Sequence, residues 1–313
     1  MEQKKLISIV IPVFNEDKGL EVLYRRLESA VSQSAYDFEI IFVNDGSGDD
    51  SLEVLITLHE KDPRIKIVDL SRNFGHQNAL TAGIDHTTGE AVILMDADLE
   101  DRPECIALFI DYWNKGYDVV YAKREKRKVT GFRKICFNVF HKTNRIVSYI
   151  PVGAEGIFCL MDRKIVQHMQ KFTEHDKYIP GLRSWVGFKQ VGIEIERDAR
   201  YDTRPRVKFG SLFKLAFDSF TSFSTLPLKL SMFLGITFSL LSFLGITTII
   251  ILKVFLKVPF RVQGWASTVV IIMLLGSIQL ICIWLQGEYL MRILNEVKNR
   301  PHYIVNDKIG FDE

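Results

Sequence analysis

The first part of the chain alternates short apolar runs with segments of helical hydrophobic spacing. Runs of strand character cover residues 6–13, 38–43, 65–70, 91–95, 117–122 and 156–161. Leu20, Leu23, Leu27 and Val31 give the first helical pattern between these runs. Strands that alternate with helices predict an α/β fold, in which a mostly parallel sheet carries helices on both faces.

Polar side chains follow each of the first four predicted strands. Ligands of open parallel sheets bind outside the carboxyl ends of the strands. We therefore expect one cleft to be lined by Asn15, Glu16, Asp45, Ser47, Arg72, Asn73, Asp96 and Asp98. A single Asp or Asn at such a position commonly caps the next helix. The repetition at four successive strand ends favours the cleft.

Asp96 and Asp98 stand at the end of the apolar run 91–95. Carboxylates at the mouth of a buried strand carry a large desolvation cost when they have no partner. Divalent cations such as Mg²⁺ take carboxylate oxygens as ligands. The pair therefore predicts a metal site, with a solvated turn as the alternative.

Two runs in the C-terminal part contain no charged residue, namely 230–252 and 265–286. Each is long enough to cross a bilayer as a helix, and a buried helix of a soluble protein is the alternative. The basic residues around them weakly favour both termini in the cytoplasm. Aromatic and apolar positions at helical spacing between 209 and 220 predict an amphipathic helix at the membrane interface, or one packed on the soluble domain.

Composition and cysteine spacing limit the cellular compartments and the enzyme classes that fit this sequence. The 313 residues carry a net charge of +2, and the four cysteines show no Cys-x-x-Cys spacing. A reduced compartment without a zinc site is the simplest interpretation. No signal peptide is expected, because residues 1–5 lead directly into a strand. No Gly-x-Gly-x-x-Gly follows the first strand, which disfavours a dinucleotide-binding oxidoreductase.

Six short motifs, together with the two C-terminal runs, resemble one enzyme family. The motifs are Ile11-Pro-Val-Phe-Asn-Glu16, Val43-Asn-Asp-Gly-Ser47, Leu70-Ser-Arg-Asn-Phe-Gly75, Met95-Asp-Ala-Asp-Leu-Glu-Asp101, Leu160-Met-Asp-Arg163 and Ser222-Phe-Ser-Thr-Leu-Pro-Leu228. Nearly the whole chain resembles the membrane-anchored family 2 glycosyltransferases of GT-A fold. Within them it is similar to the polyprenyl-phosphate glycosyltransferases, which include bactoprenol glucosyltransferases and dolichyl-phosphate mannose synthases.

The resemblance implies roles for individual residues. The donor nucleotide would lie against Pro12, Val13, Asn15, Glu16, Asp45, Ser47, Arg72, Asn73 and Ala97, with Asp45 reading the base. Asp96 and Asp98 would hold Mg²⁺ or Mn²⁺ on the donor diphosphate, with Glu100 as a third oxygen ligand. The candidates for the lipid phosphate are Arg124, Arg133 and Arg163, joined by Arg200 and Arg206.

Two positions depart from the family pattern. Glu100 stands where the family commonly has a glutamine. Residues 156–159 read Gly-Ile-Phe-Cys, whereas bacterial relatives typically read Gly-Asp-Phe-Arg. Ile157 cannot act as a base or sugar contact, so Glu155 and Asp176 are the alternatives for that role.

The reaction implied by the resemblance is the inverting transfer of a hexose from a nucleotide sugar to polyprenyl phosphate. UDP-glucose is the first choice of donor, ahead of UDP-N-acetylhexosamine, UDP-galactose and GDP-mannose. Membrane lipids are expected partners, nucleic acid is not, and homo-oligomers are left open. The expected organisation is a GT-A catalytic domain (1–206), an interfacial helix (207–228), a transmembrane hairpin (229–290) and a tail (291–313). The catalytic domain and both termini would lie on the cytoplasmic side of a bacterial inner membrane.

Two other functions are alternatives to this one. A processive polysaccharide synthase is disfavoured, because the chain lacks a Gln-x-x-Arg-Trp motif and has only two predicted spans. A non-catalytic scaffold or lipid-carrier flippase is the alternative outside enzymes. It would show no metal-dependent affinity for a nucleotide sugar.

Overall fold

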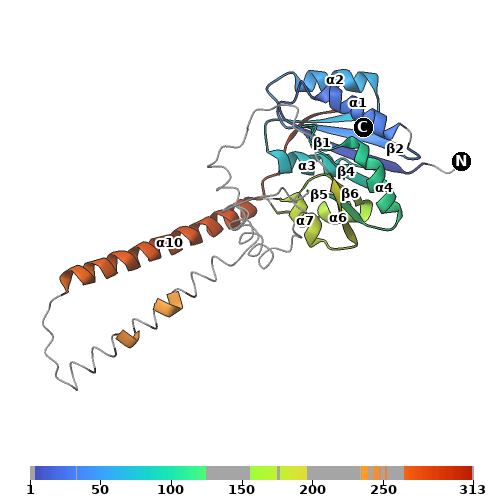
Figure 1. The fold of residues 1–313 in the computed structure, drawn as a ribbon. Helices are drawn as coiled ribbons and strands as arrows, with labels where there is room; N and C mark the ends of the chain where they lie inside the picture. The colour runs from blue at the N-terminus through green and yellow to red at the C-terminus, as the bar shows by residue number, and fades with distance from the viewer. Residues whose placement is uncertain are drawn as a thin grey trace, which may run out of the picture. The chain divides into compact units, whose positions relative to one another are not determined.

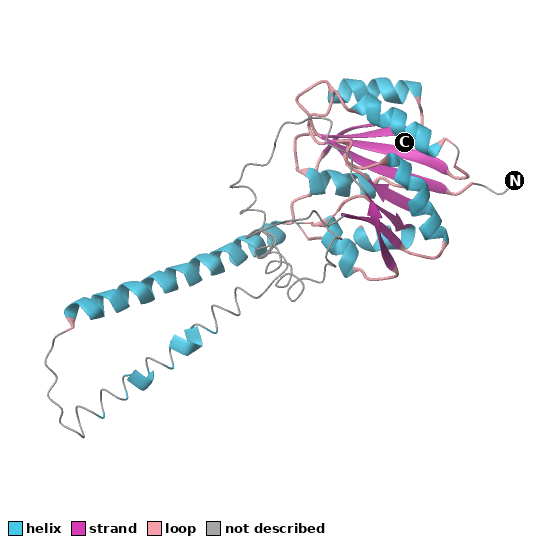
Figure 2. Ribbon diagram, in the orientation of Figure 1, coloured by secondary structure: helices cyan, strands magenta, loops and turns pink. Residues whose placement is uncertain are grey.

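The computed structural model describes residues 4–32, 34–124, 156–174, 177–195 and 264–311, with scattered positions between 233 and 251. The chain divides into two compact units. The first comprises residues 1–206 together with 301–313, and the second comprises residues 207–300. Figures 1 and 2 show the helices and strands of each unit.

The elements of the first unit follow the alternation that the sequence predicts. Its strands are β1 (Leu6–Val13), β2 (Asp37–Asn44), β3 (Ile65–Leu70), β4 (Ala91–Leu94), β5 (Val119–Arg124), β6 (Cys159–Asp162), β7 (Gln190–Ile195) and β8 (Val305–Ile309). Its helices are α1 (Leu20–Val31), α2 (Ser51–Lys61), α3 (His76–Asp85), α4 (Ile106–Asn114), α6 (Arg163–Met169) and α7 (Ile179–Trp185), with a 3₁₀ turn, η1 (Pro103–Cys105).

One eight-stranded sheet, in the order β7-β5-β6-β4-β1-β2-β3-β8, forms the centre of this unit. The pairs β1–β2, β1–β4, β2–β3 and β5–β7 are parallel. Strand β6 runs antiparallel to β4 and β5, and β8 runs antiparallel to β3. The sheet is therefore mixed rather than mostly parallel. Hydrophobic runs report the burial of a strand and not its direction, so the sequence could not show the reversal.

Two apolar cores lie on the two faces of the sheet, because successive side chains of a strand point to opposite faces. Ile7, Ile9 and Ile11 of β1 belong to the core that is covered by α1, α2 and α4. Val10, from the same strand, belongs to the core that is covered by α3, α6 and α7. Figure 2 shows the strands between the helices. The predicted α/β fold with helices on both faces is confirmed.

The C-terminal residues complete the sheet. Strand β8 pairs with the outer edge of β3, and Tyr303, Val305 and Phe311 pack against the second core. The Lys66 ammonium lies 5.2 Å from the centroid of the Phe311 ring. The segment that the sequence suggests as a cytoplasmic tail, 291–313, thus contains the end of a helix followed by an edge strand.

The second unit contains a long apolar helix, α10 (Trp265–Lys298, 34 residues). Its part from Ile271 to Lys298 is long and apolar enough to cross a membrane, and it is the one such helix within the described residues. Leu280 of this helix is 70% exposed, so the described residues leave most of its apolar side chain uncovered. The other expected span and the interfacial helix 207–228 lie mostly or wholly outside the described residues.

Candidate active site

Three loops that follow β1, β2 and β3 are bonded to one another at the carboxyl ends of these strands. The Ser47 hydroxyl accepts a hydrogen bond from the Asn15 N–H (3.1 Å), and the Asn15 side-chain oxygen accepts one from the Gly48 N–H (2.8 Å). Asn15 has a φ of 55°, which asparagine tolerates better than most residues. The Ser51 hydroxyl accepts a further bond from the Glu16 N–H (3.0 Å).

Asp45 connects the second of these loops to the third. Its carboxylate is 2% exposed and accepts hydrogen bonds from the N–H groups of Phe74 (2.7 Å) and Gly75 (3.0 Å). Burial raises the pKa of the Asp45 carboxyl above its ordinary value, although the two N–H groups and the cationic neighbours His76 and Arg72 oppose that rise. In the structure this carboxylate holds two loops together. Contact with a nucleotide base remains a prediction for it.

Gly46 lies where the loop 44–48 packs against the backbone of the loop after β3. Its φ is +63°, and a Cβ atom placed on it would come within 2.5 Å of the Arg72 carbonyl carbon. Only glycine fits this position without displacing one of the two loops. Arg72 and Asn73 are themselves exposed, and the Arg72 guanidinium stacks 4.2 Å from the centroid of Phe74.

Asp96 contacts His76, the first residue of α3. The Asp96 carboxylate lies 2.9 Å from the imidazole Nε2, and the two side chains are 24% and 47% exposed. Burial by itself lowers the pKa of His76, but the hydrogen bond and charge of Asp96, followed by the charges of Asp45 and Asp98, raise it above its ordinary value. The charges of carboxylates from two strand ends thus act on one imidazole. Sequence reasoning assigned no role to His76, although this residue directly follows the Leu70–Gly75 motif.

The turn after Asp96 is tightly folded. The Asp98 carboxylate accepts a hydrogen bond from the Glu100 N–H (3.1 Å), and Asp101 accepts one from the Asp96 N–H (3.4 Å). Leu99 has a φ of 63°, an unusual conformation for a leucine, which indicates local strain beside the carboxylates.

The carboxylates fit a metal ion that is shared with a substrate. Within the described residues, no group of three or more His, Cys, Asp or Glu side chains is arranged to hold a metal, so Asp96, Asp98 and Glu100 do not form a closed ligand set. Mg²⁺ at substrate phosphates is usually held by only one or two protein carboxylates, and phosphate oxygens and water complete its shell. Asp96 and Asp98 supply such a pair of hard oxygen donors.

The other predicted site residues fall into two groups. Pro12 and Val13 are buried at the end of β1, and Ala97 is buried in the turn after β4. Arg124 ends β5, and its side chain lies outside the described residues, as do Arg133, Glu155, Asp176, Arg200 and Arg206 in full.

Arg163 lies near the amino end of β4, whereas Asp96 lies beyond the carboxyl end of that strand. Asp162 pairs with Ala91, the first residue of β4, because β6 and β4 are antiparallel. The Arg163 guanidinium donates to the carbonyl oxygens of Gly89 (2.5 Å) and Thr87 (3.1 Å). The structure therefore does not bring Arg163 to the loops that surround Asp96.

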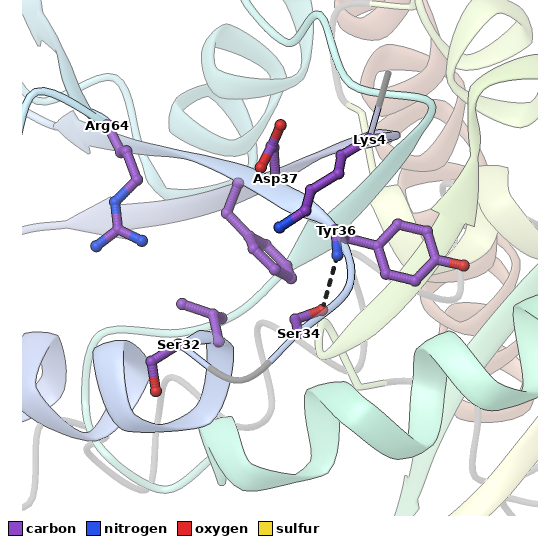
Figure 3. Close-up of a pocket in the computed structure, with 8 residues that line it drawn as sticks. Lys4, Ser32, Ser34, Tyr36, Asp37 and Arg64 are labelled. Carbon is purple, nitrogen blue, oxygen red and sulfur yellow. Dashed lines mark hydrogen bonds between the residues drawn. The ribbon is translucent and has the colours of Figure 1, made fainter. Parts of the chain in front are cut away.

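A separate pocket of about 350 Å³ lies at the amino ends of β1, β2 and β3, and Lys4, Tyr36, Asp37 and Arg64 contribute to its lining (Figure 3). Arg64 is paired with Glu28 and Asp62. This pocket is at the edge opposite to the loops after the strands, so we assign the candidate site to those loops.

The fold and these loops define an α/β enzyme whose polar groups gather at the carboxyl ends of parallel strands. The chain belongs to glycosyl transferase family 2, whose match covers residues 8–169. It is 42% identical to "Uncharacterized glycosyltransferase YkcC" of Bacillus subtilis (strain 168), over 97% of this chain and 94% of that protein. It is 36% identical to a bactoprenol glucosyl transferase of Shigella phage SfX, over 96% of this chain and 99% of that protein.

A weaker similarity links the chain to a solved structure, glucosyl-3-phosphoglycerate synthase from Mycobacterium tuberculosis. The TM-score is 0.48 at 17% identity, covering 70% of this chain and 78% of that one. The family match and the full-length relatives confirm the resemblance to family 2 glycosyltransferases, and the protein is a glycosyltransferase.

Proposed function

We propose that the protein transfers a hexose, with inversion, from a nucleotide sugar to polyprenyl phosphate at a membrane. The acceptor class is supported by several relatives named bactoprenol glucosyl transferase, which match about the full length of the chain at 36–37% identity. Binding of a nucleotide-sugar donor is supported by one observation, the convergence of Asp45, His76 and Asp96 from three strand ends.

The donor would lie over the loops that follow β1, β2 and β3. Backbone N–H groups at such strand ends and helix starts bind phosphates well. The residues proposed to bind the nucleotide are Pro12, Val13, Asn15, Glu16, Asp45, Ser47, Arg72, Asn73 and Ala97. Exposed Arg72 is the cation of this set, and its charge is among those that oppose the rise that burial causes in the Asp45 pKa.

Asp96 and Asp98 would hold Mg²⁺ or Mn²⁺ against the donor diphosphate, and Glu100 is the proposed third oxygen. When bound, the ion would stabilise negative charge on the departing diphosphate. His76 holds the Asp96 carboxylate through its imidazole Nε2 at 2.9 Å and thereby fixes its direction. The residues of the chain would position two anionic substrates, the nucleotide sugar and the lipid phosphate, close to one another, and this positioning is the main requirement of the reaction.

The acceptor needs no strong general base. The second pKa of a phosphate monoester is near 6, so the acceptor is largely dianionic at neutral pH. Loss of an acidic residue at Ile157 is therefore compatible with transfer. Arg124, Arg133 and Arg163 are the residues proposed from the sequence for the acceptor phosphate. Because Arg163 is engaged at the other sheet edge, Arg124 and Arg133 are the better candidates.

The proposed location is a bacterial inner membrane, with the first unit and both termini in the cytoplasm. α10 supports this location by its length and apolar exposed surface. The isoprenoid tail of the acceptor would stay in the bilayer while its phosphate emerges at the surface. The proposed division remains 1–206, 207–228, 229–290 and 291–313, with the last part contributing β8 to the sheet.

Calorimetric titration of the full-length protein with UDP and Mn²⁺ tests the donor site. We expect the double variant Asp96→Asn, Asp98→Asn to lose metal-dependent affinity and sugar transfer. Asp111→Asn is the matched control, because Asp111 is exposed on α4 and pairs only with Lys115 among its described contacts. Full turnover by the double variant would contradict the assignment.

A further inference from the structure

Strand β8 carries an irregularity that redirects one side chain. Asp307 pairs with Asp69, and Val305 pairs with Leu70, so Asn306 is an extra residue at a shift in register. A bulge of this kind changes the direction of the bulged side chain. The Asn306 amide here donates a hydrogen bond to the Asp69 carboxylate at 2.9 Å.

Asp69 connects Asn306 to the loop after β2. Its other carboxylate oxygen accepts a hydrogen bond from the Asn44 side-chain amide at 2.7 Å. The Asn44 side-chain oxygen in turn accepts one from the Ser47 N–H at 3.2 Å. A continuous series of hydrogen bonds therefore runs from the C-terminal strand to the loop 44–48.

Two side chains of this hydrogen-bond series, Asn44 and Asp69, are buried. Asn44 is 2% exposed and Asp69 is 7% exposed, so the Asp69 charge depends on hydrogen bonds to amides rather than on water. Asn306 itself is exposed, so replacing it leaves the core intact. The Ile304 carbonyl also accepts a hydrogen bond from the Ser71 N–H at 2.9 Å, next to Arg72. The C-terminal segment thus bonds directly to the loop after β3 and reaches the loop 44–48 through Asp69 and Asn44.

We infer that Asn306 is a positioning residue of the donor site, which acts through Asp69 and Asn44 on the loop 44–48. The inference rests on the proposed function, because it takes this loop as part of the nucleotide site. Without the Asn306 amide, the loop has fewer conformational restraints and must be ordered when the donor binds. Affinity for the nucleotide falls by the cost of that ordering.

The test compares Asn306→Ala and the isosteric Asn306→Asp with Lys308→Ala, an exposed position of the same strand. Full-length protein is titrated with UDP and Mn²⁺, and with GDP and Mn²⁺ if UDP does not bind. Because Asn306 acts on the loop only through Asp69 and Asn44, we expect only part of the value of a hydrogen bond to a carboxylate to reach the donor, as a rise of about three- to tenfold in Kd and in donor KM for Asn306→Ala. Asn306→Asp, which places a second carboxylate beside Asp69, is expected to lose at least as much.

A purely structural strand would lower the unfolding temperature and the active fraction but leave the donor Kd and KM unchanged. We expect the acceptor KM and kcat to stay within about twofold. In the background of Asp69→Asn, the further change Asn306→Ala should have little effect, because the series is already broken. Unaltered nucleotide affinity in both Asn306 variants would overturn the inference. A wild-type protein that binds neither nucleotide would overturn the proposed function as well.

Discussion

Substitution of Gly46 by alanine would show whether the loop 44–48 must rest directly on the loop after β3. The added Cβ would lie 2.5 Å from the Arg72 carbonyl carbon and 2.6 Å from the Asn73 nitrogen, both backbone atoms that cannot rotate away. The residue would also keep a φ near +63°. Gly48→Ala is the matched control, because a Cβ at that position meets no atom within 4 Å.

The structure sets the size of the effect. A left-handed conformation costs a non-glycine residue roughly 1–2 kcal/mol, and forcing an extra carbon into packed atoms costs about 1–3 kcal/mol. Together they predict a loss of roughly 2–5 kcal/mol. For a unit of this size, the corresponding fall in Tm is about 5–15 °C. If the loops separate instead, less stability is lost and nucleotide affinity falls.

Two measurements on full-length protein check this prediction, thermal unfolding by tryptophan fluorescence and calorimetric titration with UDP and Mn²⁺. Gly46→Ala should lose stability, lose at least about tenfold in affinity, or both, whereas Gly48→Ala should resemble the wild type. If the two variants gave the same Tm and the same Kd, the described contact between the loops would be refuted.

Three further predictions concern other parts of the molecule. Glu39→Gln should cost about 3 kcal/mol, because it leaves Lys66 without its buried partner. Burial opposes ionisation of Glu39, but its bonds to Lys66, Ser8 and Thr88 lower its pKa below the ordinary value. The ionised Glu39 therefore contributes its full stabilisation above the ordinary pKa of about 4.3, and this stabilisation is lost as the pH falls through the lower folded-state pKa. Denaturant titrations at pH 3–6 should show that the free energy of unfolding depends less on pH in the variant than in the wild type. Removal of divalent cations with EDTA should abolish transfer but leave Tm unchanged, since the described residues hold no closed ligand set, and a large fall in Tm would indicate a structural metal instead. His76→Ala should weaken Mn²⁺-dependent UDP binding severalfold with little change in Tm, because the side chain is half exposed; equal binding would exclude a role in directing Asp96.

Local sequence patterns correctly predicted strands of the sheet and the end of these strands at which the candidate site lies. The bounds of β1 and β3 agree with the apolar runs 6–13 and 65–70, and the loops after β1 and β2 do join Asn15 to Ser47. Both features follow from information that is local in sequence, namely period-two burial and polar residues at strand ends.

Features that depend on strand direction or distant pairing could not be predicted. Arg163 does follow a strand, but β6 runs antiparallel to β4, so its end lies at the edge away from Asp96. Strand β8 was missed because Asn306, Asp307 and Lys308 form a polar run that carries no alternating pattern. The pairing of His76 with Asp96 depends on how α3, which packs on β1 and β2, places its first residue near the end of β4, and no local pattern encodes that placement.

The central claim is tested most directly by mass spectrometry of the lipid fraction after reaction. Full-length protein would be incubated with undecaprenyl phosphate, Mg²⁺ or Mn²⁺, and in turn UDP-glucose, UDP-N-acetylglucosamine, UDP-galactose and GDP-mannose. We predict one dominant product, undecaprenyl phosphate that carries a single hexose, formed first of all from UDP-glucose. Absence of a glycosylated lipid with every donor, while the protein remains folded and binds nucleotide, would contradict the account.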